Sequence, residues 1–254
     1  MLQIEQFIFG NDNFCVLVHD PESGETASID APDAGTIRNV LEKKGWRLTH
    51  IMVTHHHFDH VAGNEALKAE YGCRIVGPKG EADKIPGIDE RLAEGDVFRL
   101  GRYAFNVIET PGHTAGHIVY HSPEAGVLFA GDTLFSLGCG RLFERGADAM
   151  WPALRKLKAL PPETQLYCGH EYTLANARFA LSIDPDNGAL KARATEVEQL
   201  REAGAATLPV ALATELATNP FLRADSAAIR AGLGMDGADD VAVFAEIRKR
   251  KDNF

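Results

Sequence analysis

The sequence predicts a protein of mixed α/β (α+β) class, in which sheets are covered by helices on their outer faces and a helical module follows. The 254 residues can bury a substantial core. Strand-like runs dominate the chain up to residue 170, with helices between them, whereas the remainder is mostly helical by composition. We therefore predict two domains, residues 1–170 and 171–254.

The first third of the chain alternates strands with helices. A helix is predicted after residue 33, with Asp33 as its N-cap and Gly45 as its C-terminal stop. A second helix, Asn64–Tyr71, ends at Gly72. Apolar or alternating runs predict the strands Gln3–Phe9, Phe14–Val18, Thr26–Ile29, Leu48–Val53 and Arg74–Val76.

The middle of the chain contains two predicted hairpins, and the last third contains helices. Gly101-Arg102 and Pro123–Gly126 are the turns of hairpins formed by Val97–Leu100 with Tyr103–Ile108 and by Ile118–His121 with Val127–Phe129. A helix over Ala149–Leu160 stops at Pro161-Pro162 and precedes a strand, Gln165–Tyr167. The helices predicted beyond this point are Tyr172–Ile183, Gly188–Ala203, Ala227–Ala231 and Asp240–Lys251.

The stretch Thr54–His60, with the sequence T-H-H-H-F-D-H, is the most informative part of the chain. Five of its seven residues can ligate a metal, and they occupy a strand-to-helix loop. Alternate side chains of an extended segment share a face, so His56 points away from its neighbours and is expected to face solvent or to form a local hydrogen bond. The stretch therefore offers two ligand pairs, His55 with His57 and Asp59 with His60, which favours two adjacent ions.

Three short glycine-containing motifs, each following a predicted strand, add further ligands. They present His113, Asp132 and His170 where the chain leaves the sheet. His117 is surplus and is predicted to be a buried hydrogen-bonding residue. Seven ligands can be assembled with room for a water or hydroxide, as in catalytic sites: His55, His57 and His113 for one ion, Asp59, His60 and His170 for the other, and Asp132 as a bridge.

Taken together, these motifs resemble the metallo-β-lactamase superfamily. More narrowly, G-C-G-R at Gly138–Arg141, N-P-F-L-R at Asn219–Arg223 and the ending R-K-R-K-D-N-F resemble the glyoxalase II (hydroxyacylglutathione hydrolase) family. The resemblance implies an αββα metallo-β-lactamase-type sandwich with a dinuclear site at a sheet edge and a C-terminal α-helical, glutathione-binding domain. It also implies hydrolysis of S-(2-hydroxyacyl)glutathione thioesters, chiefly S-D-lactoylglutathione, to glutathione and D-lactate in methylglyoxal detoxification.

The expected cofactors are two divalent metal ions, zinc first, with iron or manganese as the alternatives. A hydroxide held between two dications has its pKa lowered from ~15.7 to about 7, so it is a nucleophile without a protein base. The leaving thiol has a pKa near ~8.5 and needs no strong acid. Asp59 and Asp132 are thus predicted to act catalytically as metal ligands, with proton handling by Asp59 as a further hypothesis.

The residues expected to bind glutathione follow from the resemblance. Arg248 and Lys251 match contacts to its carboxylates, and Tyr172 matches a tyrosine that binds its peptide backbone. Arg141 stands where the family usually has lysine, and Phe143 where it often has tyrosine. Without the resemblance, the cationic run at residues 248–251 reads equally well as a solvated helix end that favours the helix dipole.

Composition limits the remaining alternatives. The net charge of -10 argues against nucleic-acid or anionic-membrane partners. No apolar run approaches ~20 residues and the N-terminus lacks a signal-peptide layout, so a cytoplasmic protein is expected, and we expect a monomer. Four scattered cysteines predict reduced thiols.

Three other activities are weighed against thioester hydrolysis. A mononuclear-iron persulfide dioxygenase and a lactonase or β-lactamase share the superfamily site but give no reason for the basic C-terminal run. A metal-binding or nucleic-acid-processing module is the alternative from another class.

Overall fold

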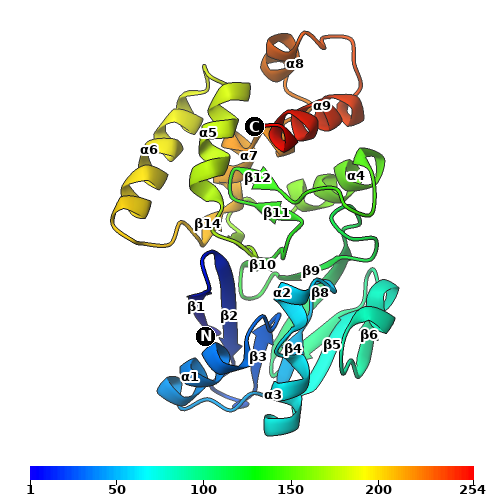
Figure 1. The fold of residues 1–254 in the computed structure, drawn as a ribbon, viewed down its shortest axis with the longest axis vertical. Helices are drawn as coiled ribbons and strands as arrows, with labels where there is room; N and C mark the ends of the chain where they lie inside the picture. Colours follow the sequence, from blue (N-terminus) through cyan, green and yellow to red (C-terminus); the bar gives the residue numbers. More distant parts are fainter. The chain divides into compact units, whose positions relative to one another are not determined.

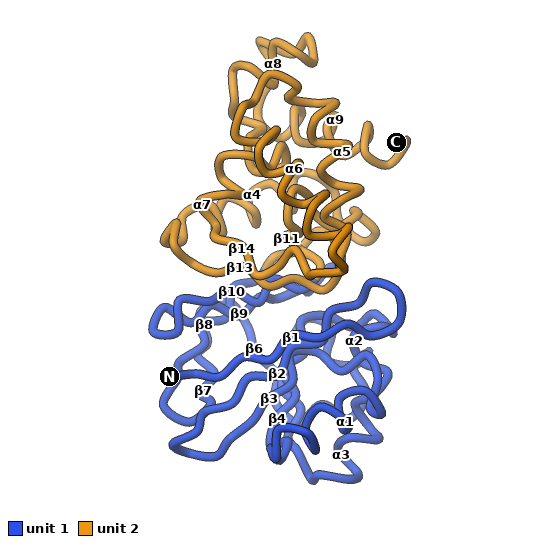
Figure 2. Tube along the Cα trace, turned by 90° about the vertical axis from the view of Figure 1, so that its left-hand side faces the viewer, with its two compact units in different colours: residues 1–109, 114–131 blue, residues 110–113, 132–254 orange.

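In the computed structural model, which describes all 254 residues, the chain forms two compact units (Figure 2). Unit 1 comprises residues 1–109 and 114–131, and unit 2 comprises residues 110–113 and 132–254. Unit 2 thus contains the whole of the predicted helical module, together with the segment that leads into it. The functional division at residue 171 stays a prediction.

The first sheet of unit 1 has six strands in the order β1 to β6 (Figure 1). The first three are antiparallel neighbours, whereas β3 to β6 pair in parallel. Parallel neighbours require crossover connections, which here contain helices. The strands are β1 (Gln3–Phe9), β2 (Asn13–His19), β3 (Thr26–Ile29), β4 (His50–Met52), β5 (Arg74–Pro78) and β6 (Glu90–Leu92), and the intervening helices are α1 (Ala34–Lys44), α2 (Phe58–Val61), α3 (Asn64–Tyr71) and the 3-10 helix η1 (Lys79–Lys84).

Helix α1 forms where the sequence predicts it, for the reasons its ends suggest. The Asp33 side chain accepts a hydrogen bond from the Thr36 amide at 2.7 Å, and Gly45 ends the helix in the left-handed conformation. Ile37 and Leu41 are fully buried and join a core cluster with the first sheet and α3. Ile51 of β4 and Val53, which follows this strand, belong to the same cluster, so the strand that leads into the Thr54–His60 loop is packed in this core.

The second group of strands in unit 1 is an antiparallel meander. It contains β7 (Val97–Leu100), β8 (Tyr103–Glu109), β9 (Ile118–Ser122) and β10 (Val127–Phe129), so both predicted hairpins are confirmed. The buried Tyr120 hydroxyl donates to the Val53 carbonyl at 2.8 Å. This bond ties the meander to the end of the strand that delivers the Thr54–His60 loop.

Unit 2 is mostly helical, as predicted for the C-terminal part. Its two small antiparallel pairs are β11 (Leu134–Phe135) with β12 (Gly138–Cys139), and β13 (Gln165–Tyr167) with β14 (Val210–Ala211). Its helices are α4 (Ala147–Lys158), α5 (Thr173–Ile183), α6 (Gly188–Glu202), α7 (Leu212–Thr218), the 3-10 helix η2 (Pro220–Leu222), α8 (Ala227–Leu233) and α9 (Asp240–Asp252).

Sequence reasoning missed the shortest elements and placed some ends incorrectly. The strands β6, β11, β12 and β14 and the helices α2 and α7 were not predicted, because elements of two to seven residues show too few repeats of any period. The predicted Ala149–Leu160 helix instead runs two residues earlier at both ends. All four cysteines are free and buried, and burial raises the pKa of their thiols. None of the helices is both long and apolar enough to cross a membrane.

Candidate metal centre

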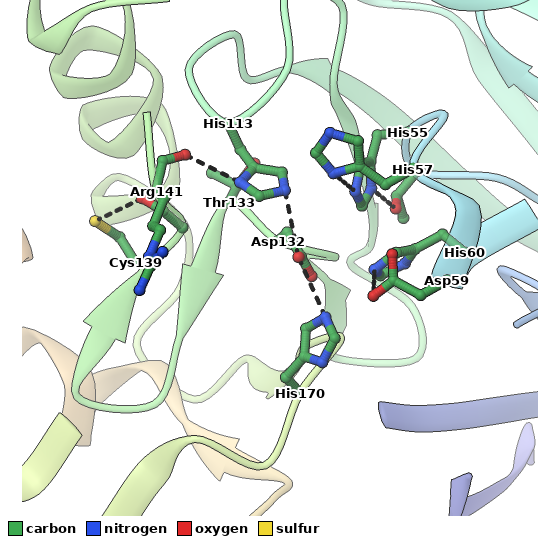
Figure 3. Close-up of polar contacts among 12 residues, drawn as sticks. His55, His57, Asp59, His60, His113, Asp132, Thr133, Cys139, Arg141 and His170 are labelled. Carbon is green, nitrogen blue, oxygen red and sulfur yellow. Dashed lines mark hydrogen bonds and ion pairs between the residues drawn. The ribbon is translucent and has the colours of Figure 1, made fainter. Parts of the chain in front are cut away.

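The Thr54–His60 loop gathers its imidazoles within unit 1. His55 Nε2 and His57 Nδ1 lie 3.1 Å apart, and the His55 and His60 ring centroids are separated by 4.1 Å (Figure 3). Asp59 and His60 both lie in the short helix α2, and Asp59 Oδ2 lies 3.8 Å from His60 Nε2. The loop therefore brings both predicted pairs of ligands together.

Asp30 is a buried carboxylate that orients these imidazoles, and sequence reasoning missed it. It accepts hydrogen bonds from the Thr54 amide at 2.7 Å, the Thr54 hydroxyl at 2.8 Å and His60 Nδ1 at 2.8 Å. Because the Thr54 hydroxyl donates to Asp30, its oxygen is left to accept from His55 Nδ1 at 3.0 Å. Both rings thereby direct their Nε2 lone pairs away from Asp30, the arrangement typical of metal-ligating histidines.

The backbone of Asp30 has φ of 57°, in the left-handed region that residues other than glycine rarely adopt. Its donor atom, with those of His55 and His60, belongs to a group whose atoms lie within 4.8 Å of one another. The signal that could have revealed it is its place directly after strand β3, since the other ligand motifs also follow strands.

We expect Asp30→Asn to weaken metal binding by about 10- to 100-fold, because an amide has one acceptor oxygen where the carboxylate serves three donors. Competitive chelation of the purified variant measures this. Asp20→Asn is the matched control, since Asp20 is also a buried aspartate of unit 1 that accepts backbone hydrogen bonds. Equal metal affinity in the two variants would contradict the role given to Asp30.

Glu81, which sequence reasoning also missed, links two of the predicted motifs. Its Oε2 atom accepts from the His56 amide at 3.0 Å and lies 2.7 Å from His56 Nδ1, while Oε1 accepts from the Gly116 amide at 2.7 Å. His56 is therefore a local hydrogen-bond partner, as predicted. The neighbouring His117 is fully buried and stacks on His55 with centroids 4.7 Å apart, which fits its predicted supporting role.

In unit 2, two buried histidines converge on one buried carboxylate. His113 Nε2 and His170 Nε2 lie 3.4 Å and 3.3 Å from the same Oδ2 atom of Asp132 (Figure 3). His113 Nδ1 lies 3.0 Å from the Arg141 carbonyl, which can only accept, so this nitrogen carries the proton and Nε2 carries the lone pair. A lone pair and a carboxylate oxygen at this separation repel each other unless a proton or a metal ion lies between them.

The seven predicted ligands thus form two sets, one in each unit. Both sets consist of imidazole nitrogens and carboxylate oxygens, a donor chemistry that suits zinc, iron or manganese. The orientation of the rings, fixed by Asp30 and by the Arg141 carbonyl, is that expected of ligands. The residues therefore fit divalent metal ions.

Arg248 and Lys251, the predicted glutathione contacts, lie on helix α9. Arg248 is only 5% exposed, and its Nη1 donates to the Cys139 carbonyl at 3.0 Å while Nη2 lies 2.8 Å from Asp252. Burial first, and then the nearby Arg248 and Arg141 guanidinium groups, lowers the pKa of Lys251. The two guanidinium groups repel the Lys251 ammonium and Asp252 offsets them only in part, so the positive potential around Lys251 favours the binding of an anion.

The two aromatic residues predicted to contact glutathione lie against the histidines of unit 2. The Tyr172 ring stacks on His170, with centroids 4.8 Å apart and planes within 1° of parallel. Phe143 lies 5.2 Å from His113 by ring centroids and is 61% exposed. An exposed apolar ring beside a candidate metal ligand offers a contact to a substrate.

Comparison with known proteins assigns both parts of the chain. Residues 31–170 match the family model described as the metallo-beta-lactamase superfamily, and residues 171–254 match that described as the hydroxyacylglutathione hydrolase C-terminus. The hydroxyacylglutathione hydrolase of Rhizobium meliloti is 58% identical over 253 residues, spanning 100% of this chain and 99% of the relative. That of Brucella anthropi is 60% identical over 253 residues, spanning 100% and 97%.

Solved structures with the same fold confirm the predicted fold class. ETHE1 from Myxococcus xanthus superposes with a TM-score of 0.70 at 24% identity, over 97% of this chain and 90% of that one. The protein TTHA1623, solved in a di-iron-bound form, superposes with a TM-score of 0.53 at 28% identity, over 64% and 92%. The first of these similarities bears on the fold alone.

Proposed function

Because the chain belongs to the hydroxyacylglutathione hydrolase family of the metallo-β-lactamase superfamily, we propose that it is a thioester hydrolase acting on S-(2-hydroxyacyl)glutathiones, chiefly S-D-lactoylglutathione. The products are glutathione and the free 2-hydroxy acid. The observation that carries this proposal is the full-length identity of 58–60% to hydroxyacylglutathione hydrolases, which includes the C-terminal region. The persulfide dioxygenase and lactonase alternatives have less support, because residues 171–254 match the hydroxyacylglutathione hydrolase C-terminus.

We assign the seven ligands to two divalent ions. His55, His57 and His113 would hold one ion, Asp59, His60 and His170 the other, and Asp132 both. Within unit 2, the approach of two imidazoles to a single Asp132 oxygen supports this bridging role. When bound, such ions supply an activated hydroxide at neutral pH and polarise the thioester carbonyl.

The protein's own groups orient the metal-binding imidazoles and handle the proton of the reaction. Asp30 and the Arg141 carbonyl fix the rings of His60 and His113 in the tautomer that presents Nε2. We also assign to Asp59 the acceptance of a proton as the thioester is cleaved, since its side chain is half exposed and its Oδ2 atom accepts a 3.3 Å hydrogen bond from Asn13 Nδ2. The departing thiolate needs no acid, because its pKa is near ~8.5.

The glutathione carboxylates are assigned to the cationic residues of unit 2. Lys251 and Arg141 supply charge, and Arg248, already bonded to the Cys139 carbonyl and Asp252, adds to the positive potential. Tyr172 and Phe143 would contact the peptide and the acyl group. Since Phe143 lacks a hydroxyl, its contribution is an apolar surface.

We expect Lys251→Ala to raise KM for S-D-lactoylglutathione by about tenfold or more while changing kcat less than about twofold, because the lost charge binds substrate and transition state alike. Steady-state kinetics of the variant measure both constants. The adjacent Lys249→Ala is the matched control, since that exposed lysine has no assigned contact. A KM unchanged in Lys251→Ala would refute the assignment.

The function is tested by following hydrolysis of S-D-lactoylglutathione by the purified protein, with metal content measured on the same sample. Turnover of the thioester, with no turnover of lactams or lactones and no oxygen consumption, is the expected result. Oxygen consumption with a persulfide and one iron per chain would instead support the dioxygenase alternative. If the protein contained its full complement of metal and still did not hydrolyse the thioester, the proposal would be refuted.

Several finer assignments belong to the same proposal. Zinc is the first candidate for both sites, with iron or manganese as alternatives, and methylglyoxal detoxification is the expected context. We also propose a cytoplasmic monomer that binds neither nucleic acid nor membrane, in line with the net charge of -10. Size-exclusion chromatography with light scattering tests the oligomeric state.

A further inference from the structure

The turn between β11 and β12 is completely buried, although it connects two strands of only two residues each. Residues 131–140 are all buried, so their polar backbone groups cannot be satisfied by bulk water. Leu137 has a backbone φ of 57°, a left-handed conformation that residues other than glycine rarely adopt. A buried, strained turn requires partners from elsewhere in the fold.

Helix α7 and the residue that follows it provide those partners. Glu215, fully buried, accepts from the Ser136 hydroxyl and the Leu137 amide, both at 2.7 Å. Asn219 Nδ2 lies 3.1 Å from the Phe135 carbonyl and 3.0 Å from the Gly138 carbonyl, on either side of the turn. Its amide also lies 3.0 Å from Glu215, so the two side chains form one clamp, the Glu215–Asn219 clamp.

The clamped hairpin is joined directly to candidate ligands of the metal centre. It begins two residues after Asp132, and the Gly140 amide donates to the Thr133 carbonyl at 3.3 Å. A Cβ atom at Gly140 would collide with the Asp132 carbonyl, so the two segments are in close contact. The next residue, Arg141, offers the carbonyl that orients His113.

We propose that Glu215 and Asn219 are positioning residues that act through the β11–β12 hairpin to set Asp132 and the His113 ring. Asn219 is the first residue of the N-P-F-L-R segment noted in the sequence, and the clamp gives this residue a structural role. The assignment rests on the proposed function in that Asp132 and His113 are taken as metal ligands. It concerns hydrogen bonds within unit 2 and involves no change in protonation.

Glu215→Gln is the main test. Glutamine keeps the side-chain volume, but only one of its two terminal atoms is an oxygen, so it cannot accept the hydrogen bonds of both Ser136 and Leu137. The expected result is faster amide exchange in residues 133–141, metal affinity about 10- to 100-fold weaker, and kcat about tenfold lower with KM within about twofold. Ser136→Ala removes one bond of the clamp and should show the same changes at smaller amplitude. It decides the question if Glu215→Gln does not fold.

Asp184→Asn is the matched control, a buried carboxylate of unit 2 whose side chain accepts hydrogen bonds from Asn187 and Arg223. It should lower the melting temperature without changing metal affinity, exchange in residues 133–141 or kcat. Folded Glu215→Gln and Ser136→Ala proteins with wild-type exchange and metal affinity would overturn the proposal. These two readouts need no turnover, so they decide it even if the wild-type protein fails to hydrolyse the thioester.

Discussion

Replacing Asp132 by alanine should lower kcat for S-D-lactoylglutathione by about a thousandfold or more. The carboxylate is buried between His113 and His170 and is the residue assigned to both ions. Metal-derived stabilisation of a transition state amounts to several kcal/mol, and about 4 kcal/mol corresponds to a thousandfold in rate. Kinetics and metal analysis of the same preparation measure the effect, and metal content should fall with activity.

Asp225→Ala is the control for this experiment. Asp225 is an exposed aspartate of the same unit that pairs with Lys158 at 2.7 Å, and such surface pairs contribute ~0–1 kcal/mol. Its replacement should leave kcat and metal content unchanged. If Asp132→Ala retained more than about a tenth of the wild-type kcat, the bridging role would be wrong, because the loss would be no larger than that of an outer hydrogen-bond partner.

Removal of the metal should abolish turnover and also destabilise the protein. A ligand that binds only the folded state raises the free energy of unfolding by about 4 kcal/mol when its concentration is a thousand times its dissociation constant. For a chain of this size, that increase corresponds to about 10 °C in melting temperature. Dialysis against a chelator, followed by calorimetry and rate measurements, tests both effects. Zinc, iron(II) and manganese(II) added back separately should each be titrated for the number of ions bound.

The titration distinguishes the dinuclear assignment from its competitors. Two ions per chain and recovery of thioester hydrolysis are expected for the wild-type protein. In Asp132→Ala, chelation should change the melting temperature less, because less metal is bound at the start. Saturation at a single ion, or full activity after complete chelation, would contradict the dinuclear assignment.

Local sequence signals predicted the parts of this fold that depend on neighbouring residues. Asp33 and Gly45 cap α1 as predicted, because capping involves atoms within four residues of each other. The Thr54–His60 loop was recognisable as a ligand cluster for the same reason, since alternation in an extended segment decides which side chains share a face. The ligands that follow strands were recognisable from glycine at the strand ends.

The sequence by itself therefore determined the inventory of candidate ligands, the sheet-and-helix class and the resemblance to a family. Only the tertiary structure decided how those ligands are held. Asp30 reaches Thr54 across 24 positions and Glu215 reaches Leu137 across 78, and neither contact leaves a periodic trace in the chain. The physical reason is that a buried donor must find an acceptor wherever the fold supplies one, and that choice is made by packing rather than by local pattern.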